Sequence, residues 1–66
     1  MKIIKDIDYY GTIHYYNEQG QWHREDGPAV EWANGDKYWW LNDIEYSEQD
    51  YNDYLLKKRL KRILEL

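Results

Sequence analysis

The residues best suited to chemistry are His23, Arg24, Glu25 and Asp26, which place an imidazole, a guanidinium and two carboxylates in one turn. Nucleophilic catalysis would also need a nucleophile that is oriented by a base. Ser47 is the only serine, it lies far along the chain, and there is no cysteine. We therefore expect Arg24 and Asp26 to brace the turn through charge-assisted hydrogen bonds. The protein is expected not to be an enzyme, with no catalytic residue.

Metal and phosphate chemistry have little support in the sequence. His14 and His23 could meet across a hairpin and bind a metal together with a carboxylate. Without a cysteine or a third histidine, this donor set is weak. No glycine-rich phosphate loop is present. We expect neither a metal nor a cofactor.

The charge of the chain is divided unevenly. Residues 1–56 hold twelve acids and four bases, a net charge of -8, whereas residues 57–66 carry a net charge of +4. The basic residues of the tail are Lys57, Lys58, Arg59, Lys61 and Arg62. Such a patch on a helix could contact phosphates, although the acidic body would repel a duplex and no aromatic residue interrupts the run to stack on single strands. The acidic surface suits steering towards a basic groove of a partner, and mimicry of nucleic acid stays open.

Aromatic residues dominate the apolar content, with four Trp, eight Tyr and no Phe. Each of these side chains has a polar tip, so it can be half buried or can anchor an interface. A chain of 66 residues forms one small core. Because disulfides are excluded, stability must come from dense aromatic packing or from self-association.

Turn signals divide the first 46 residues into short strands. Alternating, β-branched and aromatic residues predict strands within 2–10, 12–16, 21–24, 29–33 and 36–42, with a short segment at 44–46. In the turn after residue 24, Gly27 is expected to supply a positive φ and Pro28 to start the next strand without needing a ladder hydrogen bond.

The pair Asn34-Gly35 predicts a hairpin with a two-residue type I′ loop. In that register Trp32 faces Lys37, and Val30 faces Trp39. One face of the sheet would then carry the candidate core residues Val30, Trp32, Lys37, Trp39 and Leu41. The other face would carry Ala29, Glu31, Ala33, Asp36, Tyr38 and Trp40, and its aromatic residues could form a binding patch.

A helix is predicted from residue 48 to the C-terminus. Ser47 and Asp50 have the spacing of a capping box, and acids in the first turns and bases in the last turns suit the helix dipole. Tyr51, Tyr54 and Leu55 form one apolar stripe. A second stripe lies roughly opposite and consists of Leu56, Leu60, Ile63 and Leu64. One stripe can dock on the sheet, and the other predicts a homodimer.

Two segments, residues 15–22 and 39–46, share a plan of two aromatics, a polar turn and another aromatic, at an offset of 24 residues. The run His23-Arg24-Glu25-Asp26-Gly27-Pro28-Ala29, with the following Asn34-Gly35 and residues 38–42, resembles a short aromatic repeat of tailed-phage and giant-virus proteins that is likened to MORN repeats. In the second copy, Asp43 replaces the glycine of that pattern and Tyr46-Ser47 replaces His-Arg. The resemblance covers about residues 15–56 and implies a small phage accessory protein that acts in the host cytoplasm by binding a host protein.

We therefore predict one α+β domain, residues 1–66, with a meandering antiparallel sheet of four or five strands in 1–46 and a capped helix in 47–66. The expected function is binding and inhibition of a host protein, plausibly a bacterial defence component. Alternatives are nucleic-acid binding through the basic helix, or a structural part of a virion. No apolar run is long enough for a membrane span. The expected partner-binding residues are Trp22, Glu31, Asp36, Tyr38 and Trp40, and the expected turn scaffold is Arg24, Asp26, Gly27, Pro28, Asn34 and Gly35.

Overall fold

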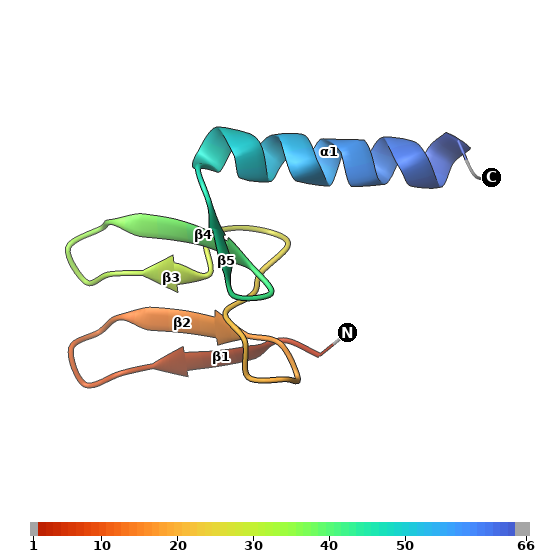
Figure 1. The fold of residues 1–66 in the computed structure, drawn as a ribbon. Helices are drawn as coiled ribbons and strands as arrows, with labels where there is room; N and C mark the ends of the chain where they lie inside the picture. The colour runs from red at the N-terminus through yellow and green to blue at the C-terminus, as the bar shows by residue number, and fades with distance from the viewer. Residues whose placement is uncertain (1, 65–66) are drawn as a thin grey trace.

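The computed structural model describes residues 2–64 and consists of an antiparallel sheet followed by one helix (Figure 1). The elements are β1 (Ile4–Ile7), β2 (Ile13–Tyr16), β3 (Val30–Glu31), β4 (Lys37–Leu41), β5 (Ile44–Tyr46) and α1 (Glu48–Leu64). The strands lie in the order β1-β2-β3-β4-β5, so each strand pairs with its neighbours in the sequence. This arrangement confirms the predicted α+β class with a meandering sheet.

The first four strands are shorter than predicted, β5 has the predicted bounds, and the strand expected at residues 21–24 is absent. Within that segment Trp22 makes only an isolated bridge with Tyr16. The chain then runs past the end of β4, where the Arg24 amide donates to the Trp40 carbonyl at 3.2 Å and the Asp43 amide donates to the Trp22 carbonyl at 3.0 Å. Residues 22–24 therefore join the first hairpin to the second without forming a strand of their own.

The predicted register between β3 and β4 is wrong by one residue. Val30 pairs with Tyr38 and Glu31 pairs with Lys37. The loop contains three residues instead of two, because the Trp32 amide donates to the Asp36 carbonyl at 2.8 Å and Gly35 alone adopts a positive φ, of 97°. A three-residue loop with its last residue in this conformation is the next commonest hairpin connection. Since a one-residue slip moves side chains to the opposite face, Trp32 joins Tyr38 and Trp40 on one face.

The offset of 24 residues seen in the sequence recurs in the backbone of the two hairpins. The Asp8 amide donates to the Thr12 carbonyl at 3.0 Å, as the Trp32 amide does to the Asp36 carbonyl. Gly11 has a φ of 83° and occupies the same loop position as Gly35. Both hairpins thus use one loop geometry, which depends on a residue that tolerates a positive φ.

The core is small and partly polar. Among residues 2–64, four apolar side chains are buried, Ala29, Val30, Leu41 and Tyr51, together with the polar residues Thr12, Asn17 and His23. The Asn17 amide is fully used: its Oδ1 accepts from the Gln19 and Gln21 amides at 3.0 Å, and its Nδ2 donates to Gln21 and Asn42. Satisfied hydrogen bonding makes its burial tolerable. With so few buried apolar side chains, the stability margin of the fold is narrow.

The turn at residues 24–28 is organised by the Arg24 side chain. Its Nε donates to Asp26 Oδ1 at 2.9 Å, its guanidinium donates to the Pro28 carbonyl at 3.1 Å, and the group lies 4.0 Å from the centre of the Tyr15 ring. The expected bracing by Arg24 and Asp26 is confirmed. The role predicted for Gly27 is wrong, since its φ is not positive. Glycine instead leaves room for the Arg24 side chain, because a Cβ there would lie 3.0 Å from the guanidinium carbon and the group would have to shift.

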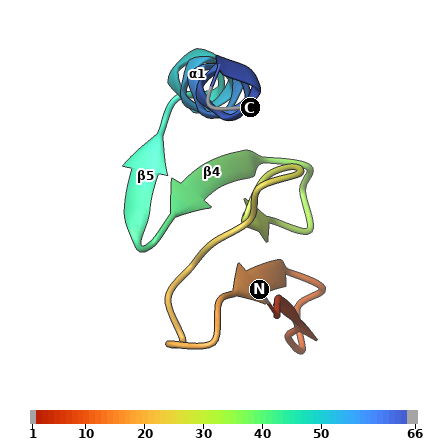
Figure 2. The same cartoon turned by 90° about the vertical axis from the view of Figure 1, so that its right-hand side faces the viewer.

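The helix α1 packs beside β4 and β5 at the end of the strand order (Figure 2). Its C-terminal half extends beyond the sheet (Figure 1). Ser47 Oγ accepts from the Asp50 amide at 3.1 Å, which confirms the predicted N-cap. Tyr51 fixes the helix: it is 2% exposed, and its hydroxyl donates to the Arg24 carbonyl and accepts from the Gly27 amide. The predicted helix runs on to residue 66, and residues 65–66 lie outside the described part of the chain. No helix within residues 2–64 is long and apolar enough to span a bilayer.

Candidate protein-interaction site

Aromatic side chains line a shallow hollow on one side of the sheet, which we call the aromatic hollow. Its lining residues are Trp22, Val30, Trp32, Tyr38, Trp40 and Glu45. Alternation along β3 and β4 puts Val30, Tyr38 and Trp40 on the same side, because residues two apart in a strand share a face. Glu45 joins them from β5 as the partner of Trp40. The hollow therefore depends on the register described above.

The rings of the aromatic hollow are arranged at an angle to one another. The Trp22 and Trp40 rings meet edge to face, with centroids 4.8 Å apart and an interplanar angle of 77°. The His14 ring stacks on Trp22 from the neighbouring strand at 5.9 Å. Trp32 and Tyr38 remain 49% and 39% exposed. Large aromatic side chains left open on a sheet are typical of contact surfaces.

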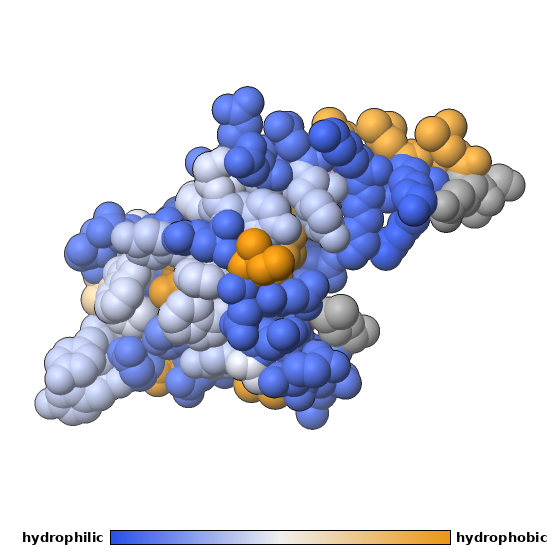
Figure 3. Space-filling view, viewed as in Figure 1, coloured by the Kyte–Doolittle hydropathy of each residue, from blue (hydrophilic) through white to orange (hydrophobic). Residues whose placement is uncertain are grey.

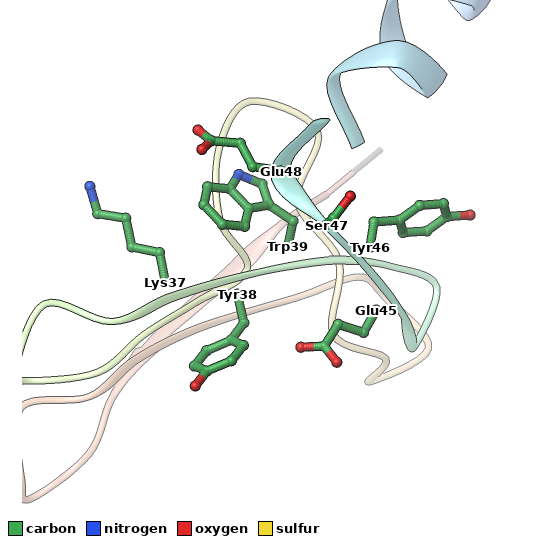
Figure 4. Close-up of a pocket in the computed structure, with 7 residues that line it drawn as sticks. All are labelled: Lys37, Tyr38, Trp39, Glu45, Tyr46, Ser47 and Glu48. Atoms are coloured by element: carbon green, nitrogen blue, oxygen red, sulfur yellow. The ribbon is translucent and has the colours of Figure 1, made fainter. Parts of the chain in front are cut away.

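The close-up view shows how β4 divides its side chains between two sides (Figure 4). Tyr38 and Glu45 point to one side of the paired strands, whereas Trp39 points to the other, where Glu48 begins the helix. The second side is the one that the helix uses, and there the Tyr46 ring lies 5.9 Å from the Tyr54 ring. The aromatic hollow thus lies on the side of β4 away from Trp39.

The five predicted partner-binding residues are only partly brought together. Trp22, Tyr38 and Trp40 line the hollow. Glu31 pairs with Lys37 on the opposite side of the sheet, and Asp36 lies at the hairpin loop, where its amide bonds to Asn34 Oδ1 at 3.0 Å. Both acids lie outside the lining of the hollow.

Three residues that line the hollow, Val30, Trp32 and Glu45, are not among the predicted partner-binding residues. The two-residue loop places Val30 and Trp32 on the other face from Tyr38 and Trp40, and no sequence pattern singles out Glu45. A three-residue loop that ends in Gly35 is also compatible with the sequence, and it would have placed Trp32 on the same face as Tyr38 and Trp40.

The two histidines do not form a joint site. His14 Nε2 lies 3.4 Å from Asp8 Oδ2, while His23 Nδ1 accepts from the Asn42 amide at 3.0 Å. Burial acts to raise the pKa of the Asp8 carboxyl, but hydrogen bonds from the Thr12 amide, His14 and the Tyr10 amide outweigh it and hold the pKa below its ordinary value. No group of three or more potential metal ligands occurs among residues 2–64.

The acid-rich turn is instead tied to the helix. Glu25 Oε1 accepts from Lys58 Nζ at 2.7 Å, and Glu25 Oε2 lies 3.5 Å from His23 Nε2. The hydrogen bond from Lys58 is the main cause that lowers the pKa of Glu25, against the opposing effect of burial. The turn residues His23, Arg24, Glu25 and Asp26 therefore brace the turn and attach it to the helix.

The residues of the second helical stripe are exposed. Leu56, Leu60, Ile63 and Leu64 are between 50% and 85% exposed, and hydrophobic surface is visible along the far half of α1 (Figure 3). Of the basic patch, Lys58 is engaged by Glu25, and Lys58, Arg59 and Arg62 flank a second hollow next to that acid. Lys57 and Lys61 lie on exposed positions of the same helix. The bases therefore spread over about half of the circumference of the helix, with the apolar stripe on the other half, and do not form one narrow basic face.

Comparisons of this chain with protein-family models, with curated proteins and with solved structures found no match. The likeness to viral aromatic repeats thus stays a resemblance carried by the residues of the turn and the hairpins.

Proposed function

We propose that this protein is a non-enzymatic binding module that recognises another protein through the aromatic hollow. The observation that carries the proposal is that Trp22, Trp32, Tyr38 and Trp40 gather on one sheet face that the helix leaves open. Tryptophan and tyrosine contribute disproportionately to binding energy at protein interfaces. In its finer form, the proposal makes the chain a phage-type accessory protein that inhibits a host protein in the cytoplasm of a bacterium, as the resemblance implies.

The small core supports this proposal. With four buried apolar side chains among residues 2–64, much apolar surface stays in water, and a partner that covers the aromatic hollow would add the burial that the chain cannot supply alone. The acidic body would guide a basic partner to this surface, because complementary potentials speed encounter.

Nucleic-acid binding by the basic helix is the weaker candidate. One of its five bases, Lys58, is held by Glu25, and the bases spread over about half of the circumference of the helix. A phosphate-binding helix would instead present its charges along one groove-facing side. A structural role in a virion has no feature of its own in the fold.

The test is affinity capture from bacterial lysate with nuclease present, followed by direct titration of the purified partner. The informative variant is Trp32→Ser, which removes a half-exposed ring of the hollow. Tyr9→Ser is the matched control, since Tyr9 is 95% exposed in the first hairpin loop. We expect Trp32→Ser to weaken binding at least tenfold, about 1.4 kcal/mol, and Tyr9→Ser to leave it unchanged.

Retention of the partner by Trp32→Ser with full affinity would refute the aromatic hollow as the binding surface. Capture of nuclease-sensitive material alone, lost when Lys57, Arg59 and Arg62 are changed to Glu, would favour the nucleic-acid alternative. Circular dichroism and the unfolding midpoint establish that each variant is folded before its affinity is compared.

A further inference from the structure

We propose that the aromatic hollow receives the guanidinium group of an arginine side chain presented by a basic partner protein. This inference rests on the proposed function and names the chemistry of its partner. The hollow combines ring faces with one carboxylate, and a cation is attracted to both.

The geometry of the rings suits a flat cation. Trp22 and Trp40 stand nearly perpendicular at 4.8 Å, and Trp32 and Tyr38 complete the lining. Trp22 and Trp40 are therefore in contact. A planar group can lie on an exposed ring face of the lining, such as that of Trp32 or Tyr38, beside this pair. The exposed fractions of Trp32 and Tyr38 show that this lining is open to solvent.

The carboxylate of the hollow is uncommitted. Glu45 makes no hydrogen bond or ion pair with any residue in 2–64, unlike Glu25, which is paired with Lys58, and Asp26, which is paired with Arg24. No Lys or Arg lines the hollow. The body that surrounds it, residues 1–56, carries a net charge of -8. The surface thus offers negative charge beside apolar rings and lacks a cation of its own, which makes it complementary to a basic partner.

The other side of the sheet already shows the same pairing within the chain. The Arg24 guanidinium lies 4.0 Å from the centre of the Tyr15 ring while its Nε bonds to Asp26. A guanidinium held by an aromatic face and a carboxylate is therefore an arrangement that this fold uses. Arginine fits better than lysine, because its planar, weakly hydrated group stacks on rings and bonds a carboxylate at its edge.

The test compares two peptides, acetyl-Gly-Ser-Arg-Ser-Gly-amide and the same peptide with citrulline in place of arginine. Citrulline keeps the shape of the side chain but carries no charge. Binding is followed by NMR from the indole N–H signals of the four tryptophans. We expect the arginine peptide to shift the signals of Trp22, Trp32 and Trp40, to leave Trp39 on the opposite side unmoved, and to bind about fivefold or more tightly than the citrulline peptide.

Two matched variants locate the carboxylate. Glu45→Gln should weaken binding of the arginine peptide about threefold or more, whereas Glu31→Gln on the opposite side should not change it. Equal affinity for both peptides, binding that moves Trp39 instead, or no shift up to about 10 mM peptide, well above the range of a useful subsite, would each overturn the inference.

Failure of this inference is distinguishable from failure of the proposed function. If the citrulline peptide binds as tightly as the arginine peptide, but Trp32→Ser still loses the captured partner, the hollow is a protein-binding site with another occupant. If Trp32→Ser keeps the partner, the proposed function itself is wrong.

Discussion

The hydroxyl of Tyr51 is the point at which the helix is most specifically joined to the sheet, and removing it tests the packing described above. The change is Tyr51→Phe, which keeps the buried ring. It deletes the donor to the Arg24 carbonyl and the acceptor of the Gly27 amide. Both backbone groups would then lie against an apolar ring edge in a site where the side chain is 2% exposed.

The expected loss in the free energy of unfolding is about 1 to 2 kcal/mol, the cost of leaving buried polar groups without partners. The total free energy of unfolding of a domain of this length is roughly 3 to 10 kcal/mol, so the substitution would remove a large share of it. It corresponds to a fall in the melting temperature of about 5 to 15 °C. Denaturant unfolding followed by tryptophan fluorescence measures it, and hydrogen exchange at the Gly27 amide reports the broken bond locally.

The pH dependence gives a second measurement of the same group. Burial raises the pKa of the Tyr51 phenol above its ordinary value of 10.0. Because the folded state holds this proton more tightly than the unfolded state, the stabilisation is complete below pH 10.0 and is lost as the pH rises through the folded pKa. The stability difference between wild type and Tyr51→Phe should therefore shrink above about pH 10.

The matched control is Tyr54→Phe. Tyr54 is 44% exposed on the same helix, and its hydroxyl bonds to nothing in the part of the chain that the structure describes. Removing the Tyr54 hydroxyl should change the free energy of unfolding by less than about 0.5 kcal/mol. Equal effects of the two substitutions, or unchanged exchange at Gly27, would refute the assigned role of Tyr51.

Three further perturbations test other parts of the fold. The low pKa of Glu25 implies stabilisation that is present above pH 4.5 and is lost as the pH falls through the folded pKa. Lys58→Met should therefore reduce the fall of the melting temperature at acidic pH, with Lys57→Met as control. An unchanged fall of the melting temperature in Lys58→Met would contradict the pairing. Gly27→Ala should cost about 1 to 3 kcal/mol through the clash with Arg24, and a double-mutant cycle with Arg24→Ala should recover part of that cost; full additivity would exclude the clash. Leu60→Asp should convert a dimer into a monomer in sedimentation equilibrium, and a wild type that is already monomeric would end the homodimer prediction.

Local signals were enough to predict the helix and the five strands, although they also predicted a strand at residues 21–24 that is absent. The capping residue Ser47, the charge gradient along the helix and the apolar spacing after it predicted α1, because these features act within one or two turns of the chain. Alternation and glycine-containing turns predicted the meander for the same reason. The bracing of the turn by Arg24 and Asp26 was also predictable, since the two residues lie two positions apart and carry opposite charges.

The register of the second hairpin was not decided by those signals. Asn34-Gly35 is compatible with a two-residue loop and with a three-residue loop that includes Ala33. The two loops place the side chains of β4 on opposite faces of the sheet relative to those of β3. In the three-residue loop, Val30 is buried and Leu41 is buried on the opposite side. Packing of both sides selects this register, and it moved Trp32 into the aromatic hollow.

The sequence by itself determined the class of fold, the order of its elements and an aromatic surface that suits binding. Only the tertiary structure decided which rings meet, because Trp22, Trp32 and Glu45 reach the hollow from three different segments. It likewise decided what Gly27 contributes, which is space for the Arg24 guanidinium and not a positive φ. Contacts between distant segments depend on register and packing, which short-range patterns do not specify.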